Sequence, residues 1–565
     1  MILASFAEIF SIGAVLPFLA VLNSPSRIFE HPAAQPFIQI LGLTSADQLL
    51  LPLSITFGLA ALFAGAMRLL LLWASTRVSF ATGADLSLNI YRRTLYQPYA
   101  VHIGRNSSEV VNGIVGKANT VTSVVVLLLN FISSSIMLVA ILIALIAVNP
   151  MIALAAFGGF GLIYGVIGRI THRKLLIDSR RIARESTQVL KLLQEGLGGI
   201  RDVLIYGSQA TYCQAYRNAD LPLRRASGDN VFIGASPRYM MEALGMVLIA
   251  FLAYALTRKS DGIANAIPVL GALALGAQRL LPVLQQAYGA WSSIQGGRAS
   301  LRDTLELLDQ PLPDYANQPP AKALPFRESI SLDQVSFRYS ADAPIVFDNI
   351  DLTITKGSRV GFIGVTGSGK STLLDILMGL LQPTHGYLAI DGQVISPDNH
   401  RSWQAHIAHV AQDIFLSDST IEENIAFGQS KDQIDPERVR IAAQRAQIAE
   451  FIEAQAKQYK SLVGERGVRL SGGQRQRVGI ARALYRNADV IVFDEATSAL
   501  DTETEQAVMH AIDNLDQDLT ILIIAHRLTT LTNCSQIVEL GDCGIMRTCT
   551  YQDIVTRAAQ KPQIN

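Results

Sequence analysis

Six apolar segments, each near the length that a helix needs to cross a bilayer, constrain this chain more than any other feature. A membrane-spanning helix needs about 20 predominantly apolar residues. All six segments end before residue 290, and the second half of the chain has none. They run approximately over residues 1–22, 50–75, 121–148, 151–171, 238–257 and 263–284. We therefore expect the first half to form an α-helical, six-span transmembrane domain.

The connections between these segments differ in length and charge. Residues 76–120 and 172–237 are long, polar and compatible with helix, and they carry 5 and 10 lysines and arginines. The connections on the opposite side, 23–49 and 258–262, carry 1 and 2. Because 5 + 10 basic residues face 1 + 2, the positive-inside rule predicts that the long loops lie in the cytosol.

The texture of the sequence changes after the last span. Residues 303–326 contain five prolines and no apolar run of membrane length. Proline lacks a backbone donor and disfavours helix in the residue before it, so 303–327 is predicted to be a linker. Short β-rich runs then alternate with amphipathic helices, which is typical of an α/β domain. We therefore expect a transmembrane domain over 1–302 and an α/β domain over 328–565.

A glycine-rich loop, GVTGSGKS, occupies residues 364–371 between a strand-like run and a helical run. This is the context of a P-loop, in which glycines let backbone N–H groups converge on phosphates at a helix N-terminus. Lys370 is expected to reach the β- and γ-phosphates, and Ser371 to ligate Mg²⁺. The predicted nucleotide contacts are Gly364, Thr366, Gly367, Ser368, Gly369, Lys370, Ser371 and Thr372.

A second motif supplies two carboxylates at the end of an apolar run. Residues 489–493 read DVIVF, and Asp494 and Glu495 follow directly. A short apolar run of this kind is typical of a buried strand. Asp494 is expected to hold Mg²⁺, directly or through water, and Glu495 to polarise the attacking water as a general base. With the P-loop upstream, the pair predicts hydrolysis of a nucleoside triphosphate.

Further motifs in the second half resemble those of ABC ATPases and occur in that family's order. Residues 470–474, LSGGQ, resemble the signature motif, and 498–501, SALD, resemble the D-loop. The resemblance covers 328–550 and implies an ABC nucleotide-binding domain that uses ATP and Mg²⁺. It further implies that Tyr339 stacks on adenine, that Gln412 contacts Mg²⁺ and the membrane half, and that His526 contacts the γ-phosphate. It adds to the ATP-binding residues Ser471, Gly472, Gly473, Gln474 and Asp501.

The signature motif implies a dimer. Ser471 and the backbone of Gly472 and Gly473 begin a helix whose N-terminus can cap a phosphate. In the family that phosphate belongs to the ATP of the partner domain, so one copy cannot complete a site. Because Glu495 and the signature are both intact, two identical copies would give two competent sites. A homodimer is favoured, and a heterodimer with an equally intact relative stays open.

The two long loops are expected to couple the halves. Each can form two helices with a turn at the tip, near Val101–Glu109 and Gly199–Gly207. We expect these tips to include short helices that dock on the ATPase domain near Gln412. Closure of two ATPase domains around ATP would then swing the membrane helices from one access to the other.

Charged residues within the spans are the main guide to the cargo. Arg68, Arg238 and Arg279 are accompanied by Glu8 and Glu242. A central arginine costs roughly 2.5–3.5 kcal/mol on insertion scales, so each needs a partner or water. One interpretation pairs Arg68 with Glu8 and Arg238 with Glu242. The other lines a water-filled cavity with the arginines, doubled in a dimer, to hold an anionic head group.

The membrane half resembles bacterial lipid-linked oligosaccharide flippases over roughly residues 1–300. The features that carry this resemblance are Glu8 with Leu16-Pro17-Phe18, Pro237-Arg238 with Glu242, and Arg279 before Pro282. The resemblance implies an integral protein of the bacterial inner membrane, with its ATPase domain in the cytoplasm. The implied cargo is a polyprenyl-pyrophosphate glycan, flipped from the cytosolic to the outer leaflet. Its pyrophosphate would contact Arg68, Arg238 and Arg279.

Other functions remain as alternatives. A multidrug or general lipid exporter has the same architecture, although arginines in the cavity suit cationic drugs poorly. A peptide exporter is less favoured because no peptidase domain precedes the first span. A soluble ABC mechanoenzyme acting on DNA would need a long coiled coil where this chain has six spans. With 47 basic and 47 acidic residues, the chain also has no net charge to favour nucleic acid as a partner.

Overall fold

The computed structural model describes residues 42–148, 150–257, 263–319, 321–495, 518–525 and 527–560, together with Glu505, Gln506 and separate positions before Gly42. The chain divides into two compact units. The first comprises Met1–Gln97 and Arg105–Leu312. The second comprises Pro98–Gly104 and Pro313–Asn565, so a short piece of the first long loop groups with the C-terminal unit.

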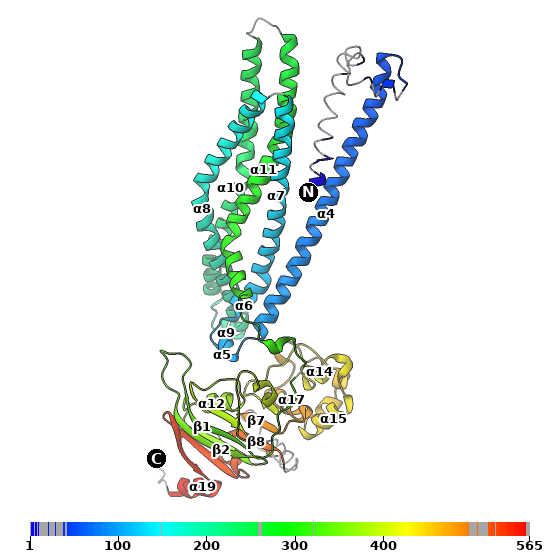
Figure 1. The fold of residues 1–565 in the computed structure, drawn as a ribbon. Helices are drawn as coiled ribbons and strands as arrows, with labels where there is room; N and C mark the ends of the chain where they lie inside the picture. Colours follow the sequence, from blue (N-terminus) through cyan, green and yellow to red (C-terminus); the bar gives the residue numbers. More distant parts are fainter. Residues whose placement is uncertain are drawn as a thin grey trace. The chain divides into compact units, whose positions relative to one another are not determined.

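Long helices make up the first unit (Figure 1). They are α4 (Leu50–Leu95), α7 (Ala118–Val148), α8 (Pro150–Gly198), α10 (Gln209–Thr257) and α11 (Ile263–Leu308). Each of the five predicted spans after the first lies within one of them, whereas the span over 1–22 lies mostly outside the described residues. Shorter elements are η1 (Ala46–Leu49), α6 (Ser107–Val111), the π-helix η2 (Asn112–Lys117) and α9 (Ile200–Ile205).

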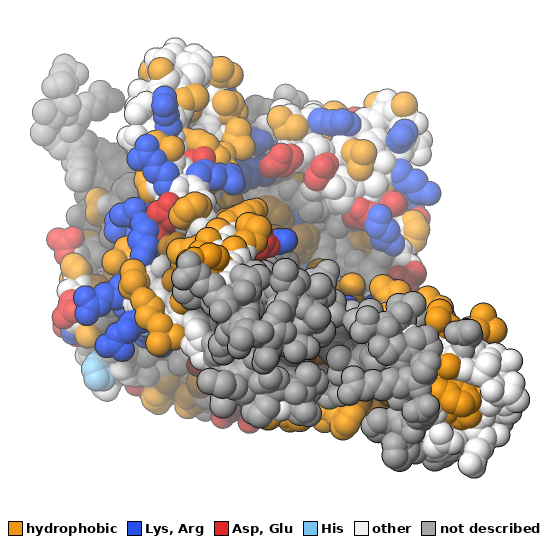
Figure 2. All heavy atoms as spheres, turned by 90° about the horizontal axis from the view of Figure 1, so that it is seen from above, with side chains coloured by type: hydrophobic (Ala, Val, Ile, Leu, Met, Phe, Trp, Pro, Cys, Tyr) orange, Lys and Arg blue, Asp and Glu red, His pale blue; other side chains and the backbone are white. Residues whose placement is uncertain are grey.

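Two stretches of helix in the described chain, Leu50–Leu95 and Ser107–Ile143, are long and apolar enough to cross a membrane. Their large side chains are widely exposed, as at Leu62 and Trp73 of α4, which are 72% and 62% exposed. In Figure 2 patches of hydrophobic side chains lie among the charged ones. An apolar surface of this extent needs a lipid or protein environment.

A buried cluster joins α7, α8, α10 and α11. It contains Ile141, Tyr164, Met241, Leu280 and Tyr288, and Met241 is fully buried. Toward the end of α11, Lys117 Nζ lies 2.6 Å from Asp303 Oδ2. Helix α11 therefore continues to Leu308, past residue 303 where the linker was predicted to begin. After Pro282 the helix meets no proline until Pro311, which lies beyond its last turn, so no proline interrupts this stretch.

The second unit contains two sheets. Strands β2 (Phe347–Thr355), β1 (Ser329–Phe337), β4 (His385–Ile390) and β5 (Gln393–Val394) form an antiparallel sheet in that order. The other sheet has the order β10-β9-β3-β8-β7-β6, parallel except for the edge strand β10. Its strands are β10 (Gly544–Cys549), β9 (Gln536–Gly541), β3 (Arg359–Gly364), β8 (Thr520–Ile524), β7 (Val490–Asp494) and β6 (Ile407–Val410).

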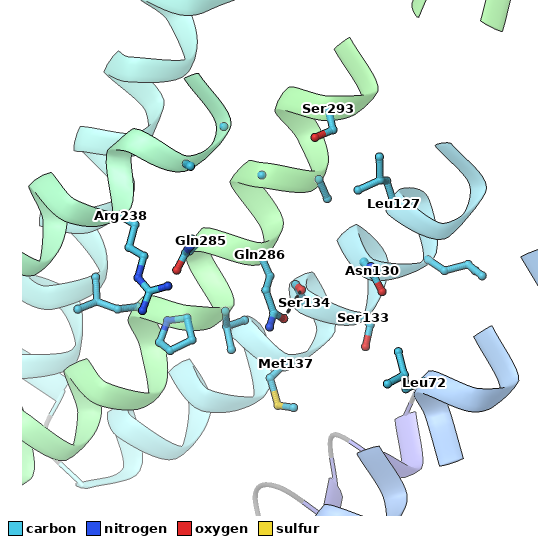
Figure 3. Close-up of a pocket in the computed structure, with 18 of the residues that line it drawn as sticks. Leu72, Leu127, Asn130, Ser133, Ser134, Met137, Arg238, Gln285, Gln286 and Ser293 are labelled. Atoms are coloured by element: carbon cyan, nitrogen blue, oxygen red, sulfur yellow. Dashed lines mark hydrogen bonds between the residues drawn. The ribbon is translucent and has the colours of Figure 1, made fainter. Parts of the chain in front are cut away.

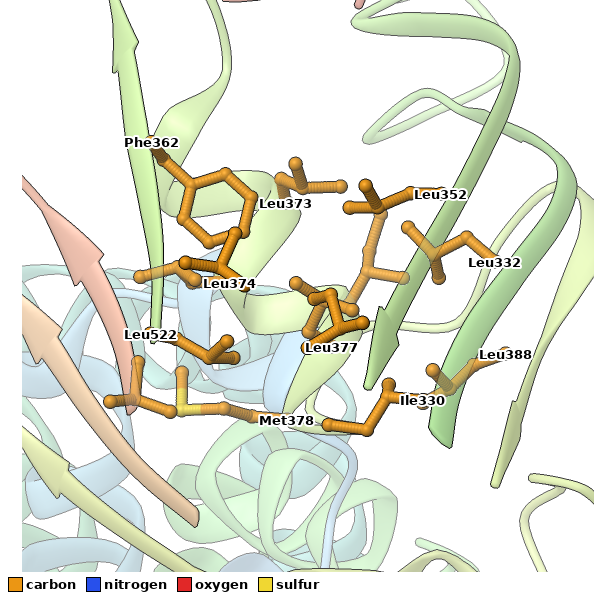
Figure 4. Close-up of a cluster of buried hydrophobic side chains, with 14 of the residues drawn as sticks. Ile330, Leu332, Leu352, Phe362, Leu373, Leu374, Leu377, Met378, Leu388 and Leu522 are labelled. Atoms are coloured by element: carbon orange, nitrogen blue, oxygen red, sulfur yellow. The ribbon is translucent and has the colours of Figure 1, made fainter. Parts of the chain in front are cut away.

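Helix α12 (Lys370–Leu377) is buried between the sheets. Leu373, Leu374 and Leu377 are almost fully buried, and they pack with Phe362 of β3 and Leu352 of β2 in one hydrophobic cluster (Figure 4). Each fully buried leucine contributes about 1.5–3 kcal/mol to folding. This packing fixes the start of α12, and therefore the loop before it, at the carboxyl end of β3.

The remaining helices of this unit are mostly short. They are α5 (Tyr99–Ile103), α13 (His400–Gln404), α14 (Ile421–Ile425), α15 (Pro436–Arg445), α16 (Ala449–Glu453), α17 (Gly472–Arg486) and α19 (Tyr551–Gln560). Residues of α14 to α17 pack in a second hydrophobic cluster with β6, β7 and β8. Ile425, Ala443, Ile452 and Val478 are fully buried there. This cluster holds the beginning of α17, where the signature motif lies, on the frame of the parallel sheet.

Candidate functional site

The P-loop joins β3 to α12, as the sequence predicts. Its backbone needs glycine, because Gly364, Gly367 and Gly369 have φ values of 153°, 88° and 89°. At Gly369 a Cβ would also lie 2.6 Å from the Phe347 ring, which is fully buried. A side chain at Gly369 would therefore disrupt this loop for two reasons: its φ value is unfavourable for other residues, and its Cβ would overlap Phe347.

Lys370 lies inside this loop rather than in solvent. Its side chain is buried, and Nζ donates hydrogen bonds of 3.0 Å to the carbonyl oxygens of Gly364 and Val365. Ser368 is buried beside it, and Ser368 Oγ has no hydrogen-bond partner within the described chain. A buried cation and an unpaired buried hydroxyl are groups that a bound phosphate would satisfy. The loop residues thus fit the phosphate contacts expected of them.

Two parallel strands bring the predicted hydrolytic residues to one edge of the sheet. Asp494 ends β7, and β7 and β3 both flank β8, so their carboxyl ends lie at the same edge. Ser371 Oγ donates to Asp494 Oδ1 at 3.5 Å. Gln412 Nε2 donates to Glu495 Oε2 at 2.7 Å. Ligands in this family of sheets bind at such an edge, where the strand order changes direction.

Glu495 has an unusual backbone conformation. It follows directly after β7, and its φ is 51°, in the left-handed region. For a residue other than glycine this conformation costs about 1–2 kcal/mol. Strain of this kind persists where the surrounding structure fixes it. The consequence here is that the Glu495 carboxylate faces the Gln412 amide.

Burial changes the acidity of two carboxyl groups near the loop. Burial and the neighbouring Glu495 raise the pKa of Asp494, against the lowering effects of Ser371 and Lys370. Burial and the charge of Asp494 raise the pKa of Asp375, in α12, to about 6. Two carboxylates therefore repel each other in a partly desolvated site. A cation bound at this edge would relieve that repulsion.

The oxygen atoms at this edge fit a magnesium ion. Mg²⁺ prefers oxygen ligands and keeps several waters, and it is usually held by one or two protein groups together with substrate phosphates. Ser371 Oγ and Asp494 Oδ1 are close enough to contact one cation, and Gln412 lies beside Glu495. No cluster of three or more His, Cys, Asp or Glu side chains suited to a metal occurs within the described residues. The ion would therefore depend on Ser371, Gln412, Asp494 and the nucleotide.

Tyr339 lies next to the P-loop helix. Its hydroxyl is 2.8 Å from Thr372 Oγ1, and its ring packs edge-on against Phe337 with 5.0 Å between centroids. The side chain is 51% exposed, which leaves a face of the ring open. An exposed aromatic face beside the phosphate loop suits the adenine stacking expected of Tyr339.

Tyr99 is a residue that sequence reasoning missed. It begins α5, within the segment Pro98–Gly104 that groups with the second unit. Burial raises the pKa of Tyr99, and so do the charges of Asp375, Tyr339 and Asp494, so these groups lie near one another. The sequence predicted a loop tip that docks on the ATPase domain, but it centred the tip on Val101–Glu109 and gave no role to Tyr99. The Gln97-Pro98-Tyr99 turn was the available signal.

The signature residues begin α17. Ser471 is its N-cap: Gln474 N donates to Ser471 Oγ at 3.2 Å, and Ser471 N donates to Gln474 Oε1 at 2.9 Å. Gly472 and Gly473 form the first turn. The capping box uses the N–H groups of Ser471 and Gln474, and the other N–H groups of the first turn have no partner within the helix, so they can contact a phosphate. Gln474 contributes to this helix start through its two hydrogen bonds with Ser471.

Two predicted residues lie outside the described part of the chain, Asp501 and His526. Their roles stay predictions. The second loop tip contains α9, in which Leu204 is 59% exposed, and Tyr206 directly after it is 79% exposed. The docking of this tip near Gln412 also stays a prediction.

The first unit contains a cavity of about 970 Å³ lined by α4, α7, α8, α10 and α11 (Figure 3). Arg68 and Arg238 both line it, as does Glu242. Arg238 Nε lies 2.7 Å from Glu242 Oε1, which confirms the predicted pair, and the two side chains are still 52% and 45% exposed. Arg238 is therefore paired with Glu242 and at the same time lines the cavity. The predicted partner of Arg68, Glu8, and the side chain of Arg279 lie outside what the structure describes.

Family models match both halves of the chain. The model described as ABC transporter matches residues 347–498. The model described as ABC transporter transmembrane region matches residues 2–266. The two matches cover the P-loop and both carboxylates in one half, and Arg68 and Arg238 in the other.

Relatives and a solved structure resemble most of the chain. An ATP-dependent lipid A-core flippase from Thiobacillus denitrificans is 32% identical over 406 residues, which cover 70% of this chain and 68% of the relative. A protein of the same name from Ralstonia nicotianae is 29% identical over 479 residues, 84% of this chain and 80% of the relative. A bacterial Atm1-family ABC exporter with ATP bound is similar in structure, with a TM-score of 0.77, 26% identity and 98% of each chain covered.

Proposed function

This chain belongs to the ABC transporter family, as a half-size exporter, and we propose that it flips an anionic lipid-linked glycan from the cytosolic to the outer leaflet. The family membership means that the chain is an integral membrane protein that binds ATP and couples its hydrolysis to transport. The identity of the cargo, the homodimer, the kind of membrane and the roles of single residues are our proposals.

The observation that carries the cargo proposal is the shared cavity of Arg68 and Arg238. Charged side chains within membrane helices often line a substrate pathway, and Arg238, although paired with Glu242, stays 52% exposed. Guanidinium binds phosphate in a bidentate manner, so this cavity suits a lipid phosphate or pyrophosphate. We propose that Arg68, Arg238 and Arg279 contact this group while the lipid tail stays in the bilayer.

The glycan lipid has two candidate sources. One is a polyprenyl-pyrophosphate oligosaccharide, which the sequence motifs favour. The other is lipid A-core, which the names of the relatives favour. Both place a charged, sugar-bearing head group on a lipid anchor, so the cavity chemistry is shared and an experiment must distinguish the two.

In our proposal a homodimer couples ATP hydrolysis to transport. Each copy would supply its P-loop to one ATP and its Ser471 signature to the ATP of the other copy. Lys370 would exchange its bonds to Gly364 and Val365 for phosphate oxygens, and Glu495, oriented by Gln412, would accept a proton from the attacking water. Bound Mg²⁺ would offset charge on the β- and γ-phosphate oxygens. We propose a bacterial inner membrane location with the ATPase units in the cytoplasm.

The test is ATPase activity of the purified protein in nanodiscs, with Glu495→Gln as the blank. We expect saturable stimulation by one of the two glycolipids and none by neutral phospholipids or cationic drugs. Stimulation by the polyprenyl lipid identifies one source, and stimulation by lipid A-core identifies the other. If only amphipathic drugs or ordinary lipids stimulate, the protein is a general exporter and the cargo proposal is wrong.

A further inference from the structure

A band of uncharged polar side chains lies in the same cavity as the two arginines. Asn130, Ser133 and Ser134 come from α7, and Gln285 and Gln286 come from α11. We call these five residues the amide–hydroxyl belt. Figure 3 shows Ser134 and Gln286 pointing toward each other, with Gln285 on the side of Arg238 and Ser133 on the side of Leu72. Apolar Leu127 and Met137 of α7 line the same cavity.

The belt lies on one face of α7. Leu127, Asn130, Ser134, Met137 and Ile141 follow one another at intervals of three or four residues, and all line the cavity. This spacing keeps side chains on one side of a helix. The polar residues therefore do not scatter around α7 but point together into the cavity.

The belt has more hydrogen-bonding capacity than its own contacts use. Within the described residues its members make one hydrogen bond to each other, from Ser134 Oγ to Gln286 Oε1, at a long 3.4 Å. Each amide offers two donors and an acceptor, and each hydroxyl offers both. Uncharged amides in a membrane segment are costly unless they meet a partner.

Two neighbouring groups point to a missing partner independently. Asn230 of α10 and Tyr164 of α8 also line the cavity. Asn230 Oδ1 and the Tyr164 hydroxyl are buried, and neither has a hydrogen-bond partner in the described chain. The Tyr164 side chain is only 8% exposed. A native structure rarely leaves such groups unpaired, so they are open to hydrogen bonds from a ligand in this cavity.

We propose that the amide–hydroxyl belt is the binding site for the sugar portion of the cargo, separate from the arginines that hold its phosphate. This inference rests on the proposed function. Sugar hydroxyls both donate and accept hydrogen bonds, as the belt does, whereas an acyl chain or a cationic drug offers no such match. The apolar side chains beside the belt provide contacts for the C–H faces of a sugar ring.

The dimensions of the cavity agree with this division. Its volume of about 970 Å³ is near the upper end of ordinary ligand pockets, which run to about 1,000 Å³. A phosphate alone would leave most of that space empty. A head group with sugars beyond the phosphate would reach from Arg238 toward the belt.

The test compares two lipids on one pair of variants. The belt variant carries Asn130→Leu and Gln286→Leu, which replace two amides with apolar side chains. The matched control is Met137→Leu, an apolar change on the same face of α7. The probes are a polyprenyl pyrophosphate that carries an oligosaccharide and the same polyprenyl pyrophosphate without sugars, and Kd is measured for each in nanodiscs.

We expect the belt variant to bind the sugar-bearing lipid at least about tenfold more weakly, because two amides that bond to sugar hydroxyls are lost. Binding of the sugar-free lipid should stay at the wild-type value, as it should for Met137→Leu with both lipids. Equal weakening for both lipids, or none, would overturn the belt as a sugar site while leaving the proposed function intact. A wild-type protein that binds neither polyprenyl lipid would exclude that source, and Kd is then measured for lipid A-core on the same variants. A wild-type protein that binds lipid A-core no better would overturn the proposed function, and this inference with it.

Discussion

Gln412 Nε2 donates a hydrogen bond of 2.7 Å to Glu495 Oε2, and this contact links the end of β7 to a side chain that follows β6. The amide holds the carboxylate without supplying a charge, so Glu495 stays available as a proton acceptor. The left-handed backbone at Glu495 belongs to the same arrangement. A neutral hydrogen bond from Gln412 and the strained backbone of Glu495 therefore both contribute to the orientation of the proposed base.

Glu495→Gln should abolish hydrolysis without abolishing ATP binding. The glutamine oxygen can still accept from Gln412, so the geometry of the site is kept while the proton acceptor is lost. Loss of a general base costs about 100-fold or more in rate. Phosphate release and retention of labelled ATP are measured on the same sample. Phosphate release at the wild-type rate would exclude Glu495 as the base.

Asp375 predicts a pH dependence of stability. Its folded-state pKa is raised to about 6 by burial and by Asp494, above the ordinary value of 3.8. Between these two values the unfolded chain holds fewer protons than the folded one, so this group makes the protein less stable as pH rises from about 4 to 6. Asp375→Asn should remove that penalty. We expect the free energy of unfolding at pH 7.5 to rise by about 1 kcal/mol after discounting for solvent screening, seen as a higher Tm, with a smaller gain at pH 5.

Asp391 is the matched control for that experiment. Burial raises its pKa, but the backbone N–H groups of Ser329, Glu328 and Arg327 outweigh this effect and lower it overall. A group with a lowered pKa stabilises the fold above its unfolded value and loses that effect as pH falls. Asp391→Asn should therefore reduce Tm at pH 7.5. Shifts of the same sign for both variants would contradict the assignment.

The glycines of the P-loop should differ in their tolerance of alanine. Gly367 and Gly369 have nearly equal φ values, 88° and 89°, but only Gly369 faces a neighbour. Each alanine would cost about 1–2 kcal/mol in backbone strain. Gly369→Ala would add overlap with Phe347, worth roughly 1–3 kcal/mol. Thermal unfolding of the two variants checks this order, and a Gly367→Ala variant of equal or lower stability would contradict it.

A charge exchange separates the two roles of Arg238. Arg238→Glu combined with Glu242→Arg keeps the pair at the same spacing on α10, so the fold should persist. The positive charge moves by about one helical turn, roughly 5.4 Å. If Arg238 holds the lipid phosphate, transport should fall at least about tenfold, with ATP binding as the folding check. Transport at the wild-type rate would mean that Arg238 only pairs with Glu242 and does not bind the lipid phosphate.

Local motifs explain why so much of the ATP site could be predicted. The spacing of the P-loop, the two carboxylates after an apolar run and the signature all lie within short stretches of chain. The sheet then brings Ser371 and Asp494 together because parallel strands end at one edge. The apolar lengths of the spans predicted the helices α4, α7, α8, α10 and α11 for the same reason.

Contacts between residues far apart in the sequence could not be predicted from such local patterns. Lys117 pairs with Asp303 across 186 positions, in the part of α11 where prolines ahead suggested a linker. Tyr99 lies near Asp375 and Tyr339 because a loop tip groups with the ATPase unit, and no motif of its own marks it. The convergence of α7 and α11 side chains into one belt likewise depends on how two helices pack. These are properties of packing, which single-segment periodicity does not encode.

The most direct test of the account is a leaflet-transfer assay in reconstituted vesicles, comparing the wild type with a variant that carries Arg68→Gln, Arg238→Gln and Arg279→Gln. The cargo is the glycolipid that stimulates the wild-type ATPase, and ATP binding serves as the folding check. We predict that the variant binds ATP but no longer transfers the glycolipid, because its phosphate has lost its cationic contacts. Transfer at the wild-type rate would contradict the central claim that these arginines hold an anionic lipid head group.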